Sequence, residues 1–253
     1  MTRKRLDVLL VERGLAESRA QAQALVMAGL VPGHDKPGEQ VDETAPLEVE
    51  RPPPYVSRAG VKLANALDAF RVDPAGLDCL DLGASTGGFT DCLLQQGAAH
   101  VVAVDVGYGQ LHPTLRGDPR VRVLERTHAK DLTPEALGGP VGLVTVDASF
   151  ISLRLLLPRL RVLAPGASFL VLVKPQFEVC RGQVGKGGVV RDNTQRAQAV
   201  AAVRSCAEEL GLEAVGEVES RLPGPKGNRE AFVWARRQAH GRRWRGPANE
   251  DRP

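Results

Sequence analysis

The pattern of apolar and polar residues after position 57 predicts alternating strands and helices. Short apolar runs occupy residues 77–82, 101–106, 121–124, 141–146 and 168–173, and longer stretches of mixed character separate them. This alternation is typical of a parallel sheet whose strands are joined by helical crossovers. Two further apolar segments, 212–218 and 231–235, are suited to complete the sheet. We therefore predict a doubly wound, mostly parallel α/β domain over residues 57–239.

The first fifty residues show a different, helical pattern. Leu6, Leu9 and Leu10 mark the apolar face of a short helix that Gly14 ends. Ser18 is placed to cap a second helix, with Ala22, Leu25 and Val26 on its apolar side. Arginine and proline at 51–54 interrupt any regular element, because proline lacks the amide donor. The sequence thus predicts a small domain over 1–50 and a linker over 51–56.

Two flanking segments complete this organisation. Ser57 is positioned to cap a helix whose buried side carries Val61, Leu63, Leu67 and Phe70, with Lys62 near its start. Residues 240–253 are rich in arginine and proline, so we predict a disordered tail there.

Composition and charge narrow the class of protein. Hydrophobic residues make up 43% and charged residues 25% of the 253 residues, which is ordinary for a soluble globular protein. The net charge of +3 is compatible with a polyanionic partner. Acidic and basic residues break the N-terminal apolar stretch, and the run 169–173 is too short to span a bilayer. We expect a cytoplasmic protein without stable membrane association; the sequence carries no signal of oligomeric state.

The four cysteines, at positions 79, 92, 180 and 206, form no CxxC pair, and the histidines do not group near them. We therefore expect reduced thiols and neither a zinc site nor a disulfide framework.

A glycine-rich turn follows the first strand of the predicted sheet. It is neither a GxGxxG fingerprint nor a P-loop, and it should open a helix near Gly87. A carboxylate before such a turn suits a ligand that carries an amino group and a nucleoside. The predicted cofactor contacts are Asp81, Gly83, Ala84, Ser85, Thr86, Gly87, Gly88, Phe89 and Thr90.

Further charged residues come at the ends of later strands. Asp105 follows the second strand, where a carboxylate accepts hydrogen bonds from ribose hydroxyls. This pairing indicates a nucleoside cofactor, either S-adenosylmethionine or NAD. Asp147 and Lys174 end the fourth and fifth strands. Lysine is rare in this chain, with seven in all, and unlike arginine it loses its proton when desolvated.

Five segments in order resemble the TlyA family: 57–63, 81–90, 146–150, 173–178 and 227–230. The resemblance runs from about Arg5 to Trp234. It implies a Rossmann-like class I methyltransferase sheet of the FtsJ type behind a small α+β RNA-binding domain. It also implies S-adenosylmethionine as cofactor, methylation of a cytidine 2′-hydroxyl, and ribosomal RNA or ribosomal subunits as partner. The catalytic tetrad of that family falls on Lys62, Asp147, Lys174 and Glu230, with Asp147 also at the cofactor.

A ribose hydroxyl is a poor nucleophile, so its methylation needs a base and careful positioning. Lys174 is the candidate base. Lys62 would lower the pKa of Lys174 by like-charge repulsion and stabilise the developing alkoxide, whereas two nearby carboxylates would raise that pKa, and the sequence leaves this balance open. Asp147 and Glu230 would orient the lysines and the hydroxyl.

The N-terminal part resembles the alpha-L RNA-binding fold of the same family, which places Arg3, Lys4, Arg5 and Arg19 at RNA phosphates. Arg58 is a fifth predicted RNA contact.

The sequence departs from the family pattern at two places. Residues 31–37 are shorter than in the family, so the small sheet should be reduced. His128 stands where relatives have asparagine, at a predicted adenine contact. Residues 185–192 read either as a mobile loop near the substrate or as a plain surface loop.

Three alternatives stay open at this point. An NAD-dependent oxidoreductase would use the glycine turn and Asp105, but it leaves Lys62, Lys174 and Glu230 without a role. A non-enzymatic RNA-binding or assembly protein would keep the fold alone. Membrane lysis follows from the historical name of the family, hemolysin, and the sequence offers no strongly amphipathic cationic helix in its support.

Overall fold

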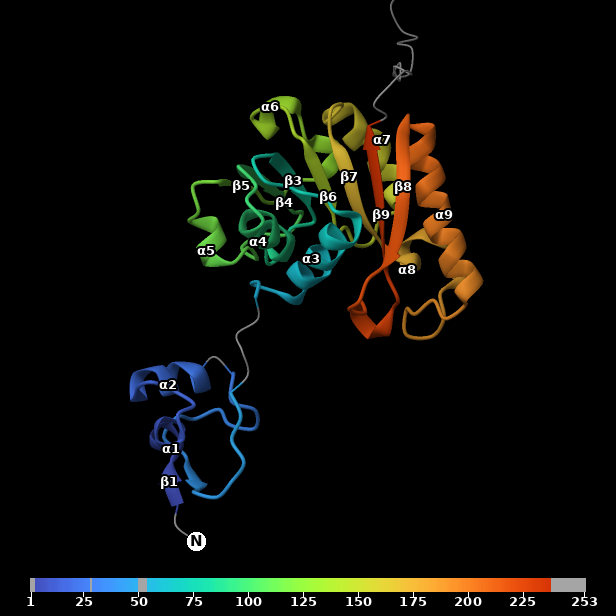
Figure 1. Ribbon diagram of the computed structural model, residues 1–253. Coiled ribbons are helices and arrows are strands. Elements are labelled where there is room, and N and C mark those ends of the chain that lie inside the picture. Colours follow the sequence, from blue (N-terminus) through green and yellow to red (C-terminus); the bar gives the residue numbers. More distant parts are fainter. Residues whose placement is uncertain (1–2, 28, 50–53, 238–253) are drawn as a thin grey trace, which may run out of the picture. The chain divides into compact units, whose positions relative to one another are not determined.

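The computed structural model describes residues 3–27, 29–49 and 54–237. The chain divides into two compact units, residues 1–53 and 54–253, here called the N-terminal unit and the catalytic unit (Figure 1). Residues 51–53 of the predicted linker and the whole predicted tail, 240–253, lie outside the described residues.

The N-terminal unit is a pair of helices beside a minimal sheet. Strands β1 (Arg3–Arg5) and β2 (Gln40–Asp42) pair antiparallel, and helices α1 (Leu6–Glu12) and α2 (Arg19–Met27) lie between them in the chain. Both predicted helices are present, and the Ser18 hydroxyl accepts a hydrogen bond from the amide of Gln21 at 3.2 Å. Their apolar faces bury one small core. The sheet has only two three-residue strands, as the shortened segment led us to expect.

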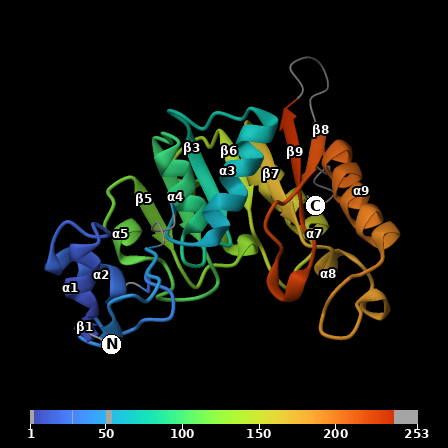
Figure 2. The same cartoon turned by 60° about the horizontal axis from the view of Figure 1, so that its bottom comes forward.

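The catalytic unit is built on a seven-stranded sheet with the order β5-β4-β3-β6-β7-β9-β8 (Figures 1 and 2). All pairings from β5 through β7 are parallel, and β9 runs antiparallel to both of its neighbours. The predicted mostly parallel sheet is therefore confirmed. Its strands are β3 (Asp78–Leu82), β4 (His100–Val104), β5 (Val121–Leu124), β6 (Leu143–Val146), β7 (Ser168–Val173), β8 (Leu212–Glu219) and β9 (Ala231–Arg237).

Helices cover both faces of this sheet, because the strands are apolar on both sides. One core packs the strands against α7 (Leu153–Leu163) and α9 (Asn193–Glu209), and the other packs them against α3 (Arg58–Phe70) and α4 (Gly88–Gln95). Ser57 occupies the cap position of α3, but its hydroxyl makes no capping bond there. Shorter helical turns lie at the loops: α5 (Pro113–Arg116), α6 (Pro134–Leu137), α8 (Pro175–Glu178), η1 (Ala129–Asp131), η2 (Arg181–Gln183) and η3 (Pro225–Gly227).

The strand order reverses between β3 and β6, which lie side by side although β4 and β5 separate them in the chain. Open α/β sheets bind ligands at the carboxyl ends of the strands at such a switch point. The glycine turn follows β3 and Asp147 follows β6, so both lie at this place. The topology alone thus locates the candidate site.

Candidate active site

A cavity of about 290 Å³ opens at this switch point and brings together all four residues of the predicted tetrad. Two come from strand ends, Asp147 after β6 and Lys174 after β7; Lys62 comes from α3, and Glu230 directly precedes β9. The wall is completed by the α3 start and the glycine turn, with Ser57, Arg58, Ala59, Gly83, Ala84, Ser85, Thr86 and Phe89.

The glycine turn needs its glycines for conformation and for close packing. Gly83 and Gly87 have φ angles of +88° and +96°, which side chains rarely tolerate. A Cβ on Gly83 would lie 2.6 Å from the carbonyl oxygen of Asp147. The turn therefore sits directly against the end of β6, and helix α4 begins immediately after Gly87, as predicted.

Asp105 has the geometry expected of a ribose-binding carboxylate. Its two oxygens accept hydrogen bonds from the amides of Ser85 at 2.8 Å and Gly107 at 2.7 Å. A carboxylate offers about four acceptor positions, so two remain for a diol. With the bare backbone of the glycine turn beside it, this donor set fits a nucleoside cofactor.

Several predicted cofactor contacts lie outside the cavity wall. The carboxyl of Asp81 is fully buried and accepts a bond from the Thr90 hydroxyl at 2.7 Å and one from Thr145 at 3.3 Å. Burial raises the pKa of Asp81 to about 7. Asp81 and Thr90 thus brace the turn from beneath. Gly87, Gly88 and Asp105 are likewise absent from the wall, and His128 is exposed at the start of η1.

Inside the cavity the tetrad forms two separate lysine–carboxylate pairs. The Nζ of Lys62 donates to Glu230 Oε2 at 2.6 Å, and the Nζ of Lys174 lies 2.6 Å from Asp147 Oδ1. Lys62 is 6% and Lys174 9% exposed. Each lysine thus has its own compensating carboxylate, which changes the expected picture of one lysine acting chiefly on the other by repulsion. The Nζ of Lys174 also donates to the Ser149 hydroxyl at 2.8 Å.

Glu230 keeps one oxygen available. Its Oε1 is buried and has no hydrogen-bond partner among the residues that the structure describes. An unsatisfied buried acceptor is costly unless a ligand group satisfies it. Glu230 lines the cavity together with the two lysines, and its unsatisfied oxygen is packed against the backbone of Gly224.

An exposed aromatic side chain lies just beyond the Lys174–Asp147 pair. Phe150 is 91% exposed, has a φ of +66°, and stands 5.2 Å from the ring of Phe177. Sequence reasoning assigned no role to Phe150 or Ser149. The signal was a bulky apolar residue three positions after the strand-end carboxylate Asp147, and its solvent exposure does not follow from the sequence.

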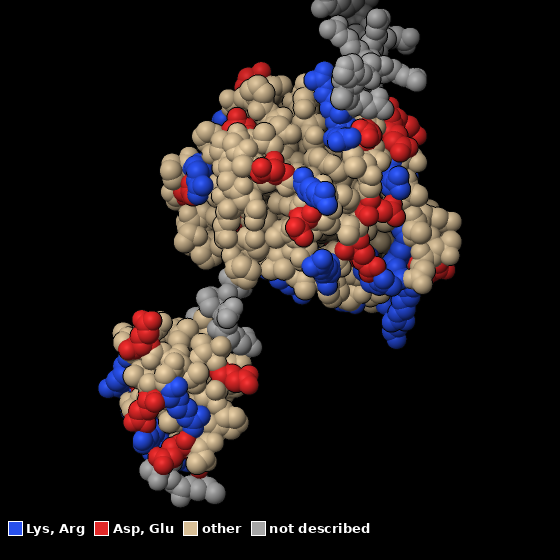
Figure 3. All heavy atoms as spheres, viewed as in Figure 1, with Lys and Arg blue, Asp and Glu red and all other residues tan. Residues whose placement is uncertain are grey.

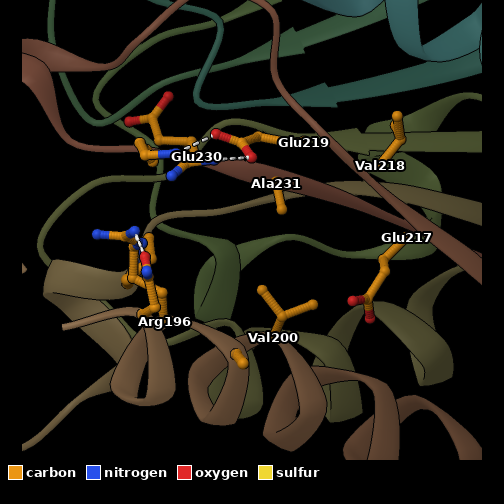
Figure 4. Close-up of a pocket in the computed structure, with 11 residues that line it drawn as sticks. Arg196, Val200, Glu217, Val218, Glu219, Glu230 and Ala231 are labelled. Atoms are coloured by element: carbon orange, nitrogen blue, oxygen red, sulfur yellow. Dashed lines mark hydrogen bonds and ion pairs between the residues drawn. The ribbon is translucent and has the colours of Figure 1, made fainter. Parts of the chain in front are cut away.

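A second pocket, of about 230 Å³, lies between α9 and the strands β8 and β9. Figure 4 shows Arg196 and Val200 on the helix and Glu217 on the strand above it, whereas the Val218 side chain points away from the helix. Glu230 borders both pockets. Within this second pocket Glu219 forms an ion pair with Arg229, and the Arg196 guanidinium donates to the neutral amide of Asn193.

In the N-terminal unit, the cations predicted to bind RNA gather around carboxylates. Asp7 is fully buried and accepts bonds from Arg5 at 2.9 Å, Arg19 at 3.1 Å and Gln23 at 2.8 Å. The Arg5 guanidinium beside it holds the pKa of Asp7 well below its usual range. Lys4 pairs with Glu12 at 2.8 Å. Arg3, Lys4, Arg5 and Arg19 share this unit, whereas Arg58 lies on the wall of the catalytic cavity.

Among the described helices, none combines the length and apolar character needed to cross a bilayer. The described residues also contain no cluster of three or more histidine, cysteine or acidic side chains placed to hold a metal ion.

Comparison with known families and structures agrees with this arrangement. The FtsJ-like methyltransferase family matches residues 55–237, and the S4 domain family matches residues 4–31. A solved structure of a hemolysin-named protein from Streptococcus thermophilus superposes with a TM-score of 0.72 at 40% identity, over 94% of this chain and 90% of that one.

Two relatives span nearly the full length. The 16S/23S rRNA (cytidine-2′-O)-methyltransferase TlyA of Mycobacterium tuberculosis is 55% identical over 93% of this chain and 91% of its own. Hemolysin A of Brachyspira hyodysenteriae is 40% identical over 89% of this chain and 97% of its own. The match decides for a methyltransferase over an NAD-dependent oxidoreductase. This chain belongs to the TlyA family of FtsJ-like methyltransferases, with an S4 domain in front of the catalytic domain.

Proposed function

We propose that this protein transfers a methyl group from S-adenosylmethionine to the 2′-hydroxyl of a cytidine in ribosomal RNA. The observation that carries the proposal is the meeting of two buried lysine–carboxylate pairs and a glycine turn in one cavity. The substrate class follows from the TlyA relative, which acts on cytidines of 16S and 23S rRNA by its name.

The cofactor would be held at the glycine turn. The backbone of residues 83–86 would lie against it, and the free acceptor positions of Asp105 would take the ribose hydroxyls. His128, near the end of β5, would lie toward the adenine. When bound, S-adenosylmethionine supplies an electrophilic methyl group on a sulfonium. The chain must then place a hydroxyl in line with that methyl group and remove its proton.

Lys174 is the group proposed to take that proton. The neutral amine of Lys174 would accept the proton as the ribose oxygen takes the methyl group, and the ammonium formed would be stabilised by Asp147 and by donation to the Ser149 hydroxyl. Lys62 would stabilise the negative charge that develops on this oxygen. The free Oε1 of Glu230 would accept a hydrogen bond from the substrate and orient it.

The RNA would meet the enzyme at two places. At the cavity, Arg58 offers a cation to the backbone and Phe150 offers an exposed ring on which a base can stack. On the N-terminal unit, Arg3, Lys4, Arg5 and Arg19 would bind phosphates. Asp7 fixes Arg5 and Arg19 without hiding them, since their side chains stay 45% and 57% exposed.

The decisive experiment supplies labelled cofactor with naked ribosomal RNA, each ribosomal subunit and whole ribosomes, and then maps the label. We expect 2′-O-methylcytidine at a discrete position. Label on a base, or no label in any RNA, would overturn the proposal. Comparison of the subunits shows which of them carries the target.

A further inference from the structure

The loop of residues 185–190 is fastened to the segment before β9 by one buried side chain. Asn228 is 3% exposed. Its Oδ1 accepts from the amide of Val190 at 3.1 Å, and its Nδ2 donates to the carbonyl of Gly188 at 2.9 Å. Two segments almost forty residues apart in sequence are thus joined by both ends of one amide. We call residues 185–190 and 223–229 together the docked loops (Figure 1).

Besides this fastening, the first loop is anchored at its end by Val190, whose side chain is buried and whose carbonyl accepts from Arg196. Gly185, Gly187 and Gly188 have no side chains to pack, and the last two have φ angles of +84° and +80°. The loop closes on itself through the amide of Gly185, which donates to Val189 at 3.1 Å, and that of Gly188, which donates to Gly185 at 3.0 Å. Asn228 therefore sets the position of a preformed turn.

The second loop is in direct contact with the catalytic carboxylate. A Cβ on Gly224 would lie 2.0 Å from Glu230 Oε1, so the backbone there lies against that carboxylate. The amide of Gly224 donates to the carbonyl of Asn228 at 2.8 Å, and Asn228 is two residues before Glu230. The docked loops are consequently tied to the wall of the cavity.

The docked loops carry two lysines that lack carboxylate partners. Lys186 and Lys226 are exposed, and within the described ranges neither forms an ion pair, whereas Arg204 and Arg229 nearby each pair with a glutamate. Lys226 is held at a φ of +59°, and its Nζ lies 4.0 Å from the place of a Cβ on Gly188. Figure 3 shows basic side chains gathering at this end of the catalytic unit.

We propose that the docked loops form a binding ridge for the RNA backbone, with Lys186 and Lys226 at phosphates and Asn228 as the positioning residue. Unpaired lysines on a ridge with a backbone fixed relative to Glu230 suit a polyanion that must enter the adjoining cavity. A small anionic ligand would not need two lysines on separate loops. This inference rests on the proposed function, since it takes RNA as the substrate.

The first test is the double variant K186Q/K226Q. We expect the KM for naked ribosomal RNA to rise about tenfold, with kcat and the affinity for S-adenosylmethionine unchanged. The slope of log affinity against log salt should fall by roughly 1.4 to 1.8, the contribution of two phosphate contacts. A matched control is R71Q/R122Q, which removes equal charge from two exposed arginines outside the docked loops and the cavity wall, one at the end of α3 and one on β5, and should leave both quantities unchanged.

The outcomes separate this inference from the proposed function. If the wild-type protein methylates RNA and K186Q/K226Q keeps its KM and salt slope, the ridge does not bind RNA and the inference fails alone. If the wild-type protein methylates no RNA, the proposed function fails, and direct titration with ribosomal RNA still tests the two lysines. An equal effect in the control variant would reveal nonspecific electrostatics and would overturn the ridge.

The second test addresses the positioning residue with N228A. We expect hydrogen exchange at the Val190 amide to accelerate, because its acceptor is gone, and the KM for RNA to rise as in the lysine variant. Accelerated exchange with an unchanged KM would show that the loop position is irrelevant to RNA. The lysine variants keep the inference testable if N228A folds poorly.

Discussion

The two units use buried carboxylates in opposite ways. Asp7 in the N-terminal unit is buried, but its arginine partners are 45% and 57% exposed. Glu230 in the catalytic unit is buried together with Lys62, which is 6% exposed. In the first case the cations stay hydrated and face solvent, so they can meet phosphates. In the second the whole pair is desolvated, and its charges act strongly on whatever enters the cavity. The two ion pairs therefore differ chiefly in the burial of the cation. An exposed cation is suited to bind phosphate, and a buried one is suited to act on a reacting group.

The largest expected effect comes from removing a desolvated cation. Lys174→Ala should lower methyl transfer to RNA about a thousandfold, because a positioned general base contributes 10² to 10⁴ in rate. Incorporation of labelled methyl groups measures it. Lys174→Arg separates two roles, since arginine keeps the charge but does not release its proton.

The control for both variants is calorimetry with S-adenosylmethionine, which should give an unchanged affinity. Full activity of Lys174→Arg would contradict proton transfer and leave only an electrostatic role. Unchanged methylation by Lys174→Ala would remove Lys174 from the mechanism altogether.

The next effect compares two neighbouring residues, Arg229 and Glu230, which directly precede β9. Glu230→Gln leaves Lys62 buried without a compensating charge, so we expect a loss of about 3 kcal/mol in unfolding free energy and roughly a hundredfold in activity. Arg229→Gln breaks the exposed pair with Glu219 and should change neither appreciably. Chemical denaturation and methyl incorporation measure the two variants side by side. Equal losses in both would refute the distinction by burial.

Much of the fold was predictable from local sequence. The apolar runs found all seven strands of the large sheet to within two residues at either end, and the strand-end positions of Asp105, Asp147 and Lys174 followed from them. The spacing of apolar residues, and the residue type that follows each apolar run, can both be read from a short stretch of sequence. The four residues of the tetrad came from the family resemblance, and the structure places them in one cavity.

The rest depends on contacts between distant segments. Nothing local distinguishes the buried Asp81, which accepts from the hydroxyls of Thr90 and Thr145, from Asp105, which accepts from backbone amides of Ser85 and Gly107. The ion-pair partners of the two lysines likewise depend on tertiary contacts. Lys62 on α3 pairs with Glu230 before β9, and Lys174 after β7 pairs with Asp147 after β6. Asn228 joins two loops that sequence reading treated separately.

A smaller effect tests the N-terminal side of the comparison. Asp7→Ala removes the acceptor of Arg5, Arg19 and Gln23, so we expect this unit to lose about 1 to 3 kcal/mol of stability. RNA affinity should also fall, because the two arginines are no longer held in place. Hydrogen exchange resolved by unit measures the first effect and RNA titration the second. Faster exchange in the catalytic unit as well would contradict a local role for Asp7.

The smallest expected effect is a change of the unfolding free energy with pH. The contributions of Asp7 and Asp81 to this change have opposite signs. The folded pKa of Asp7 is lowered, so its stabilisation is present above its ordinary pKa near 4 and is lost as pH falls. The folded pKa of Asp81 is raised to about 7, mainly by burial. The folded state therefore binds the Asp81 proton more tightly than the unfolded state does, and stability declines as pH rises from about 4 through 7.

Asp81→Asn removes that titration while its amide oxygen still accepts from Thr90. We expect its unfolding midpoint to vary less than that of the wild type between pH 5 and 8, in thermal melts followed by circular dichroism. Asp118→Asn is the control, because Asp118 pairs with Arg120 at the surface and its pKa is lowered, so it does not titrate in this interval. Identical pH profiles for the wild type and Asp81→Asn would mean that Asp81 is ionised throughout. Its two hydroxyl donors would then compensate burial as fully as the arginines do at Asp7.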